Sequence, residues 1–182
     1  LNSFVYTGAG ETVTRLITDT TGMTANRTHR IEASGSGPLV LANYTNATTG
    51  AFTMFLELRG WNTDRNEISS ILANGTGGTL AVTKTDGGTW MLTGPNTYTG
   101  GTNVNSGFLG ISGATVGTSG TSISTGALTI SNAGIFATNA GGLTIGNTTQ
   151  IAANTTAQFI GQNSISITNT LRGVSGNPWT VS

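Results

Sequence analysis

Residues 84–112 read KTDGGTWMLTGPNTYTGGTNVNSGFLGIS, and no other part of the chain says more about how it folds. Three short apolar runs lie in this stretch, at Trp90–Leu92, around Tyr98 and Val104, and at 108–111. Gly and Asn residues, which favour tight turns, end each run. No run is long enough for a helix, so the stretch predicts strand, turn, strand, turn, strand as one winding of the chain.

Strand signals also recur outside this stretch, about every 10 to 15 residues, with no helical periodicity between them. One strand is expected at 13–17, and a polar loop is expected at 43–50. We expect irregular coils with longer loops over residues 1–83 and regular coils over 84–182. The whole pattern predicts an all-β chain.

The most apolar strand is expected from Phe52 to Leu58, where every second residue is apolar. Alternate residues of a strand face opposite sides of its sheet. If Phe52, Met54, Leu56 and Leu58 face the core, Phe55 and Glu57 face outward.

The second half of the chain contains an internal repeat. The segment GALTISN at 126–132 recurs as GGLTIGN at 141–147, fifteen residues later, and looser copies lie at 107–112 and 164–169. A unit this short cannot bury its apolar stripe alone and must stack on neighbouring units. The repeat therefore predicts an elongated β-solenoid of parallel strands, with one coil for each copy.

The composition favours an extracellular setting and excludes several partners. Charged residues make up 8% of the 182 residues, against roughly 25% in a typical soluble domain. The net charge is zero, so we expect no nucleic-acid partner. The chain has no cysteine, which excludes disulfides and thiolate metal sites, and no apolar run that could span a membrane. A neutral surface rich in hydroxyls and amides is typical of secreted or cell-surface bacterial β-proteins.

Residues 84–112 resemble the autotransporter-associated β-strand repeat, also called the passenger-associated transport repeat. The resemblance rests on Lys84, the Gly88-Thr89-Trp90 and Asn96-Thr97-Tyr98 triplets and spaced glycines, and Asp86 departs from it at a turn. It implies a right-handed parallel β-helix exported by, or displayed on, a Gram-negative-type bacterium. It brings no catalytic residue and no cofactor. The residues expected to form the core of the repeat are Trp90, Leu92, Tyr98, Val104 and Leu109.

Few residues are candidates for catalysis, and we predict that the chain is not an enzyme. His29 is the only histidine and has no second imidazole or nucleophile motif beside it, so we expect a surface strand residue. Glu57, Asp64 and Glu67 lie close in sequence, and two carboxylates facing one groove could cleave a polysaccharide. The simpler interpretation of this group is a charged loop.

Two further chemistries are weaker alternatives. Lys84, the single lysine, could form an isopeptide bond with an Asn beside an acid, although the repeat pattern already accounts for it. Thr-x-Thr pairs such as Thr97 and Thr99 suggest ice binding, but the pairs do not recur at a constant period.

The sequence predicts a structural surface protein whose coils stack into a fibre or filament. The coils would stack through tandem repeats of the chain or end-to-end self-association, because a solenoid end presents unpaired backbone groups. The alternative is an adhesin or glycan-binding passenger segment that contacts surface glycans through Trp61 and Trp179. A polysaccharide-cleaving enzyme is the third hypothesis.

Overall fold

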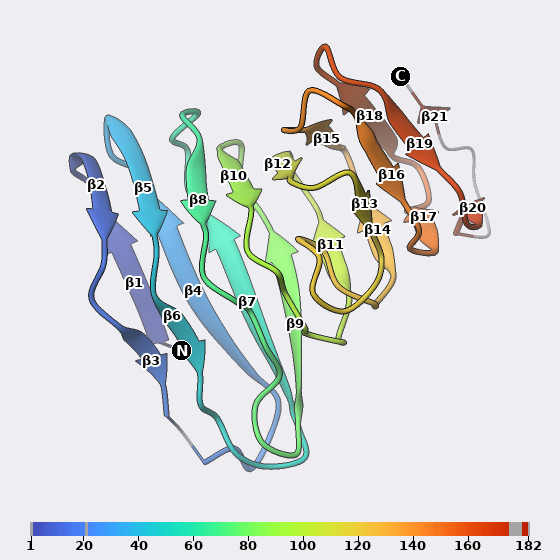
Figure 1. The fold of residues 1–182 in the computed structure, drawn as a ribbon. Helices are drawn as coiled ribbons and strands as arrows, with labels where there is room; N and C mark the ends of the chain where they lie inside the picture. Colours follow the sequence, from blue (N-terminus) through green and yellow to red (C-terminus); the bar gives the residue numbers. More distant parts are fainter. Residues whose placement is uncertain (1, 21, 175–179, 182) are drawn as a thin grey trace.

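The computed structural model describes residues 2–20, 22–174 and 180–181. Within these ranges it contains 21 β-strands, and all regular structure is strand. Every pairing between two named strands is parallel, and pairing residues lie one coil apart in the sequence (Figure 1). The chain is therefore an all-β protein with the fold of a parallel β-solenoid, as the sequence predicted.

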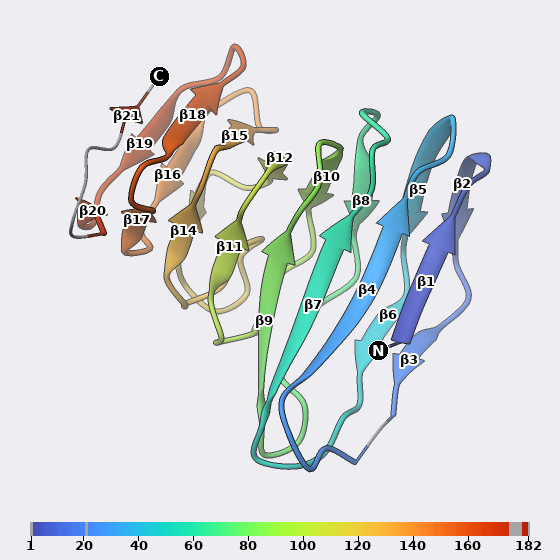
Figure 2. The same ribbon diagram turned by 180° about the vertical axis from the view of Figure 1, so that it is seen from behind.

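Two sheets of eight strands run along the solenoid, and each successive coil adds one strand to both. The first sheet, which faces the viewer in Figure 2, contains β1 (Asn2–Tyr6), β4 (Arg27–Ala33), β7 (Thr53–Arg59), β9 (Thr79–Lys84), β11 (Thr102–Val104), β14 (Leu128–Ile130), β17 (Thr149–Ile151) and β20 (Leu171–Gly173). The second sheet contains β2 (Ala9–Val13), β5 (Gly37–Leu41), β8 (Asn66–Ile68), β10 (Thr89–Leu92), β12 (Gly107–Ile111), β15 (Ala133–Ala137), β18 (Thr156–Ile160) and β21 (Thr180–Val181).

Shorter sheets form a third side of the coils at each end. β3 (Ile17–Asp19) pairs with β6 (Tyr44–Asn46) in the first coils. β13 (Thr115–Val116), β16 (Leu143–Ile145) and β19 (Ile165–Ile167) form a three-stranded sheet in the last ones. The coils thus follow one another from β1 and β2 at one end of the stack to β20 and β21 at the other (Figure 1).

A coil is longer than the internal repeat suggested. Asn2 pairs with His29, 27 residues further on, and the shortest step among the described strands runs from Thr89 to Phe108, 19 residues apart. The two best copies of the repeat form β14 and β16, which belong to different sheets, so the prediction of one coil for each copy is wrong. Strands on different sides of a coil all direct alternate residues toward the same core. The same short apolar pattern can therefore occur twice within one coil.

Two strand boundaries also differ from the prediction. The strand expected at 13–17 is divided, because β2 ends at Val13 and β3 begins at Ile17. The loop expected at 43–50 contains β6, a polar strand that parallel pairing with β3 holds in place. Tyr44 and Thr45 are residue types that favour strands, so the polar character of this segment concealed a strand that its neighbour in the preceding coil completes.

The core is a continuous apolar column between the sheets. In β7, Met54, Leu56 and Leu58 are buried and Phe55 and Glu57 face outward. Phe52 lies before the strand and is 37% exposed, so it does not share their buried face. The period-two pattern of the sequence therefore predicts the inward-facing residues correctly within β7. It fails at Phe52, which lies before the first residue of the strand.

Candidate functional site

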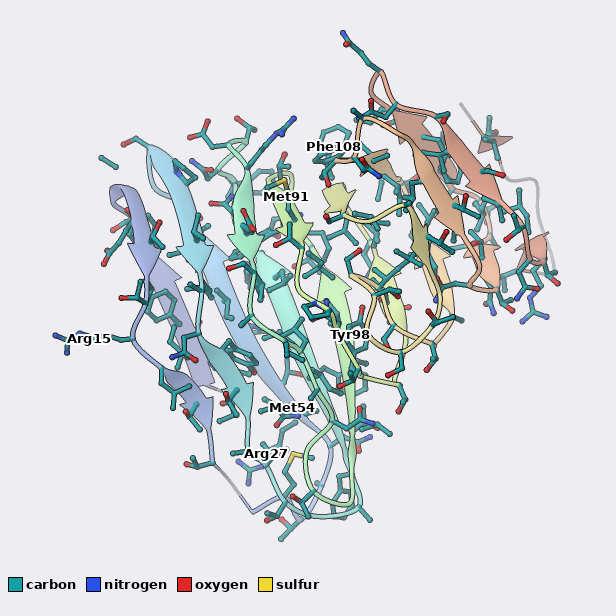
Figure 3. All side chains as sticks on the ribbon, viewed as in Figure 1. Arg15, Arg27, Met54, Met91, Tyr98 and Phe108 are labelled. Carbon is teal, nitrogen blue, oxygen red and sulfur yellow. The ribbon has the colours of Figure 1, made fainter. Side chains whose placement is uncertain are left out.

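The expected core residues of the repeat all lie inside the solenoid. Trp90, Leu92, Tyr98, Val104 and Leu109 are buried, and Figure 3 shows Tyr98 within the coils. The indole Nε1 of Trp90 donates a 3.1 Å hydrogen bond to the backbone oxygen of Arg59 in the preceding coil. The Tyr98 hydroxyl lies 2.6 Å from Oγ1 of Thr102, and burial raises the pKa of Tyr98 to about 12.

Lys84 is buried completely, which is unusual for a lysine. Its ammonium donates hydrogen bonds to the backbone oxygens of Thr85, Asp86 (2.8 Å) and Ser106 (3.2 Å), so it ties together turns of two neighbouring coils. Burial lowers its pKa to about 8, and the nearby Asp86 carboxylate partly offsets this effect. Among the described residues its hydrogen-bond partners are backbone oxygens only, rather than the Asn side chain that an isopeptide bond would need.

Buried asparagines make similar links between coils. Oδ1 of Asn96 accepts a 2.7 Å hydrogen bond from the Leu72 amide in the preceding coil, and its Nδ2 donates one of 2.6 Å to the Ser122 oxygen. Asn66 accepts a bond from the Leu39 amide and donates one to the Thr89 oxygen, so it joins the strands on both sides of its own. These amides satisfy backbone groups of the neighbouring strands and loops.

His29 is not the surface residue that was expected, because it is only 7% exposed. Residues 27–33 alternate along β4, and this alternation turns His29 inward with Ile31. Its Nδ1 contacts the Asp19 carboxylate, which also accepts a 2.6 Å hydrogen bond from the Tyr44 hydroxyl. Burial and the neighbouring Asp19 raise the pKa of Tyr44 well above its ordinary value.

The histidine cluster therefore has three polar side chains that satisfy one another inside the solenoid. His29, Asp19 and Tyr44 come from three strands of two successive coils. The period-two pattern of residues 27–33 could have revealed the burial of His29, but its partners depend on the coil register. A buried polar network of this kind stabilises one arrangement of its strands and has no surface for a substrate.

The three carboxylates considered for hydrolysis do not face one groove. Glu57 points outward from the first sheet, where its Oε2 accepts a 2.6 Å hydrogen bond from Nε of Arg30. Glu67 points outward from the second sheet and accepts a 2.5 Å bond from Thr93, while Asp64 lies in the loop between them. Within the described residues there is also no group of three His, Asp or Glu side chains placed to hold a metal.

Among the residues that the structure describes, Trp61 is the most exposed large apolar side chain, at 70%. It follows β7, at the corner between the two main sheets, and its ring lies against Gly87 of the next coil. A Cβ at Gly87 would come within 2.9 Å of the indole. The ring is thus supported from beneath by a glycine turn. Trp179, the other predicted glycan contact, lies outside the described residues.

Comparison with known families identifies the winding formed by residues 84–112. Residues 82–111 match the family model of the passenger-associated-transport-repeat. This chain carries a passenger-associated-transport-repeat. The matched range agrees with the expected repeat at 84–112, and the prediction of an autotransporter repeat protein is confirmed.

A curated relative supports this result. The chain is 37% identical over 107 residues to a protein described as "Adhesin BmaC autotransporter" from Brucella suis biovar 1 (strain 1330). The match covers 54% of this chain but only 3% of that adhesin, so the chain spans a small part of its relative. No solved structure matches the chain. Across the described residues, none of the structure forms a helix that could cross a membrane.

Several polar residues that belong to the passenger-associated-transport-repeat are buried in this winding and hydrogen-bonded there. Lys84 and Asn96, which match the repeat pattern, each bond to backbone groups of other turns or coils. Trp90 and Tyr98 fill the space between the sheets and bond with their polar atoms as well. The repeat is thus a winding whose matching residues attach it to the coils before and after it.

Proposed function

We propose that this chain is a rigid, surface-exposed stalk within a bacterial adhesin passenger. Such a stalk would hold adhesive parts of the molecule away from the cell. The observation that carries the proposal is the continuous stacking of parallel strands in two eight-stranded sheets around one continuous apolar core. The likeness to an autotransporter adhesin supports the surface setting.

The arrangement of polar groups also favours a mechanical role. Buried Lys84, Asn66 and Asn96 link neighbouring coils. The carboxylates of Glu57 and Glu67 are held in separate contacts on different sheets. A series of such links resists separation of the coils, because pulling one coil away exposes buried polar groups as well as the core. Repeat proteins gain stability from these nearest-neighbour interfaces.

A replacement experiment in the source bacterium tests the stalk. Residues 1–182 are deleted in frame from the gene, or replaced by an unrelated β-solenoid of equal length, and adhesion and surface reach are measured. Deletion should reduce both reach and adhesion, and the unrelated solenoid should restore them. If the unrelated solenoid restores reach but not adhesion, the chain itself binds the target and is no mere spacer.

We also propose that further coils cover the two ends of the described stack. Apolar side chains at these ends are only partly buried: Phe4, Tyr6, Val13 and Ile17 at one end, and Phe159, Ile165 and Ile167 at the other. Strand addition from a tandem copy or a second chain would bury them and pair the edge strands. Sedimentation should then show mass growing with concentration. A monomer at all concentrations would exclude stacking between separate chains.

A glycan-binding role is the second candidate function, and the exposure of Trp61 favours it. A supported aromatic ring that faces solvent can stack on the apolar face of a sugar. The test is binding of the labelled chain to a glycan array. If Trp61 makes the contact, binding is lost in Trp61→Ala and retained in Trp61→Phe, and equal binding by both variants removes Trp61 from consideration.

A further inference from the structure

The outer face of the first sheet contains a hollow of about 160 Å³, lined by Thr28, Phe55, Glu57 and Thr83. These residues come from β4, β7 and β9, three adjacent strands of one sheet. Thr28 is paired in register with Phe55, and Glu57 with Thr83. The hollow is therefore built on rigid strands, and no loop contributes to its lining.

Phe55 forms the apolar floor of this hollow. It points outward although its neighbours Met54 and Leu56 are buried, so it is an aromatic side chain that the core does not use. Its partner in the register is Ala81, which also points outward and is nonetheless only 1% exposed. Phe55 and Ala81 are thus adjacent apolar residues on the outer side of the sheet, and Phe55 is the aromatic platform of the hollow.

Glu57 supplies an oriented acceptor at the edge of the platform. Its Oε2 accepts a 2.6 Å hydrogen bond from Nε of Arg30, and its Oε1 accepts one of 3.0 Å from the hydroxyl of Thr85. A carboxylate oxygen can accept two hydrogen bonds, so each of these atoms has a further lone pair for a ligand. The two contacts fix the carboxylate in place before any ligand arrives.

The charges of this hollow favour a neutral ligand. The Glu57 carboxylate is neutralised by the guanidinium of Arg30, with which it forms an ion pair. An anionic group would be repelled by Glu57, and a cationic group would compete with Arg30. The remaining polar groups of the lining are the hydroxyls of Thr28 and Thr83, which can both donate and accept.

We propose that this hollow binds one ring of a neutral glycan. The apolar face of the sugar stacks on Phe55, and its hydroxyls donate to Glu57 and exchange hydrogen bonds with Thr28 and Thr83. An apolar platform with a few convergent polar groups is the usual form of a small-ligand site. This site is separate from Trp61, which lies beyond the end of β7, and it adds a binding activity to the proposed stalk.

The same face also indicates the direction of a longer glycan. From Thr83 the outward register continues through Asn103 and Thr129 to Gln150, one polar residue for each coil. Adjacent strands lie roughly 4.8 Å apart, so these side chains form a row of hydrogen-bonding groups along the solenoid axis. A polysaccharide anchored at Phe55 would therefore extend along this row toward β17.

Glycan-array binding followed by calorimetric titration tests the site. The intact chain is probed with neutral, sialylated and sulfated oligosaccharides, and the best neutral one is titrated. Removing the platform in Phe55→Ala should weaken binding about tenfold, the scale of a lost aromatic stacking contact. Glu57→Gln should also weaken it. Phe52→Ala is the matched control, because Phe52 is an exposed phenylalanine outside the hollow.

The outcomes separate the proposal from its alternatives. Phe52→Ala and Trp61→Ala should change the affinity by less than about twofold, and Phe55→Tyr, which keeps the ring, should retain binding even if Phe55→Ala folds poorly. Binding that is lost in Trp61→Ala but kept in Phe55→Ala would overturn the assignment. Binding of acidic glycans only, or of no glycan, would overturn it as well, and neither result would bear on the stalk.

Discussion

Replacement of Lys84 by Met tests the most unusual contact of the repeat. The substitution removes three hydrogen bonds from a charged donor to partly buried backbone oxygens. Each such bond contributes about 1.5–3 kcal/mol. The gain from no longer burying the ammonium opposes this loss. Burial lowers the pKa of Lys84 from 10.5 to about 8, which corresponds to about 3 kcal/mol. The loss exceeds the gain, so Lys84→Met should lower the free energy of unfolding by about 1.5–6 kcal/mol.

The assay is urea unfolding at pH 7, followed by circular dichroism. The free energies of unfolding of the variants are compared provided that their m-values agree. Arg15→Met is the control, because Arg15 projects into solvent at one end of the solenoid (Figure 3). The control should unfold within about 0.5 kcal/mol of the unmodified chain. If Lys84→Met is as stable as the control, or more stable, the ammonium does not hold the two turns together and this account of the repeat is wrong.

Three further predictions concern the other buried polar groups. Between pH 8 and 10.5 the folded state holds fewer protons than the unfolded one, because the pKa of Lys84 is lowered, so stability should rise with pH. Between pH 10.5 and about 12 stability should fall again, because Tyr98, whose pKa is raised to about 12, keeps its proton in the folded state only. Urea unfolding at a series of pH values across this range checks both the rise and the fall of the free energy of unfolding. The rise should be absent from Lys84→Met. Asn96→Ala leaves a buried amide and a buried carbonyl unpaired and should cost about 2–5 kcal/mol in urea unfolding, against little change for the exposed Asn105→Ala. His29→Ala removes one of the two partners of the buried Asp19 carboxylate and leaves only Tyr44, so it should cost about 1–3 kcal/mol at pH 7, and an unchanged midpoint would contradict the cluster.

The architecture was predictable because it depends on local patterns. Period-two alternation and frequent turn residues indicated short strands, and the recurring segments indicated that these strands stack. The core residues Trp90 and Tyr98 belong to the family pattern, so their position inside the coil needed no knowledge of the other coils.

Coil length and polar partners were not predictable in the same way. The fifteen-residue spacing of the segments at 126–132 and 141–147 measures the distance from one side of a coil to another, and no local signal distinguishes this from a full turn. The contact of His29 with Asp19 depends on the register of neighbouring coils, as does the meeting of Thr28, Phe55 and Thr83 on one face. Such contacts follow from the number of residues in each coil, which turns and loops determine.

The stalk proposal requires that this chain lies outside the cell that makes it. The direct measurement is labelling of intact cells with an antibody raised against residues 1–182, before and after treatment with an external protease. We expect strong labelling of intact cells that protease treatment removes. Labelling that appears only after the cells are permeabilised would contradict the surface location and, with it, the proposed role in adhesion.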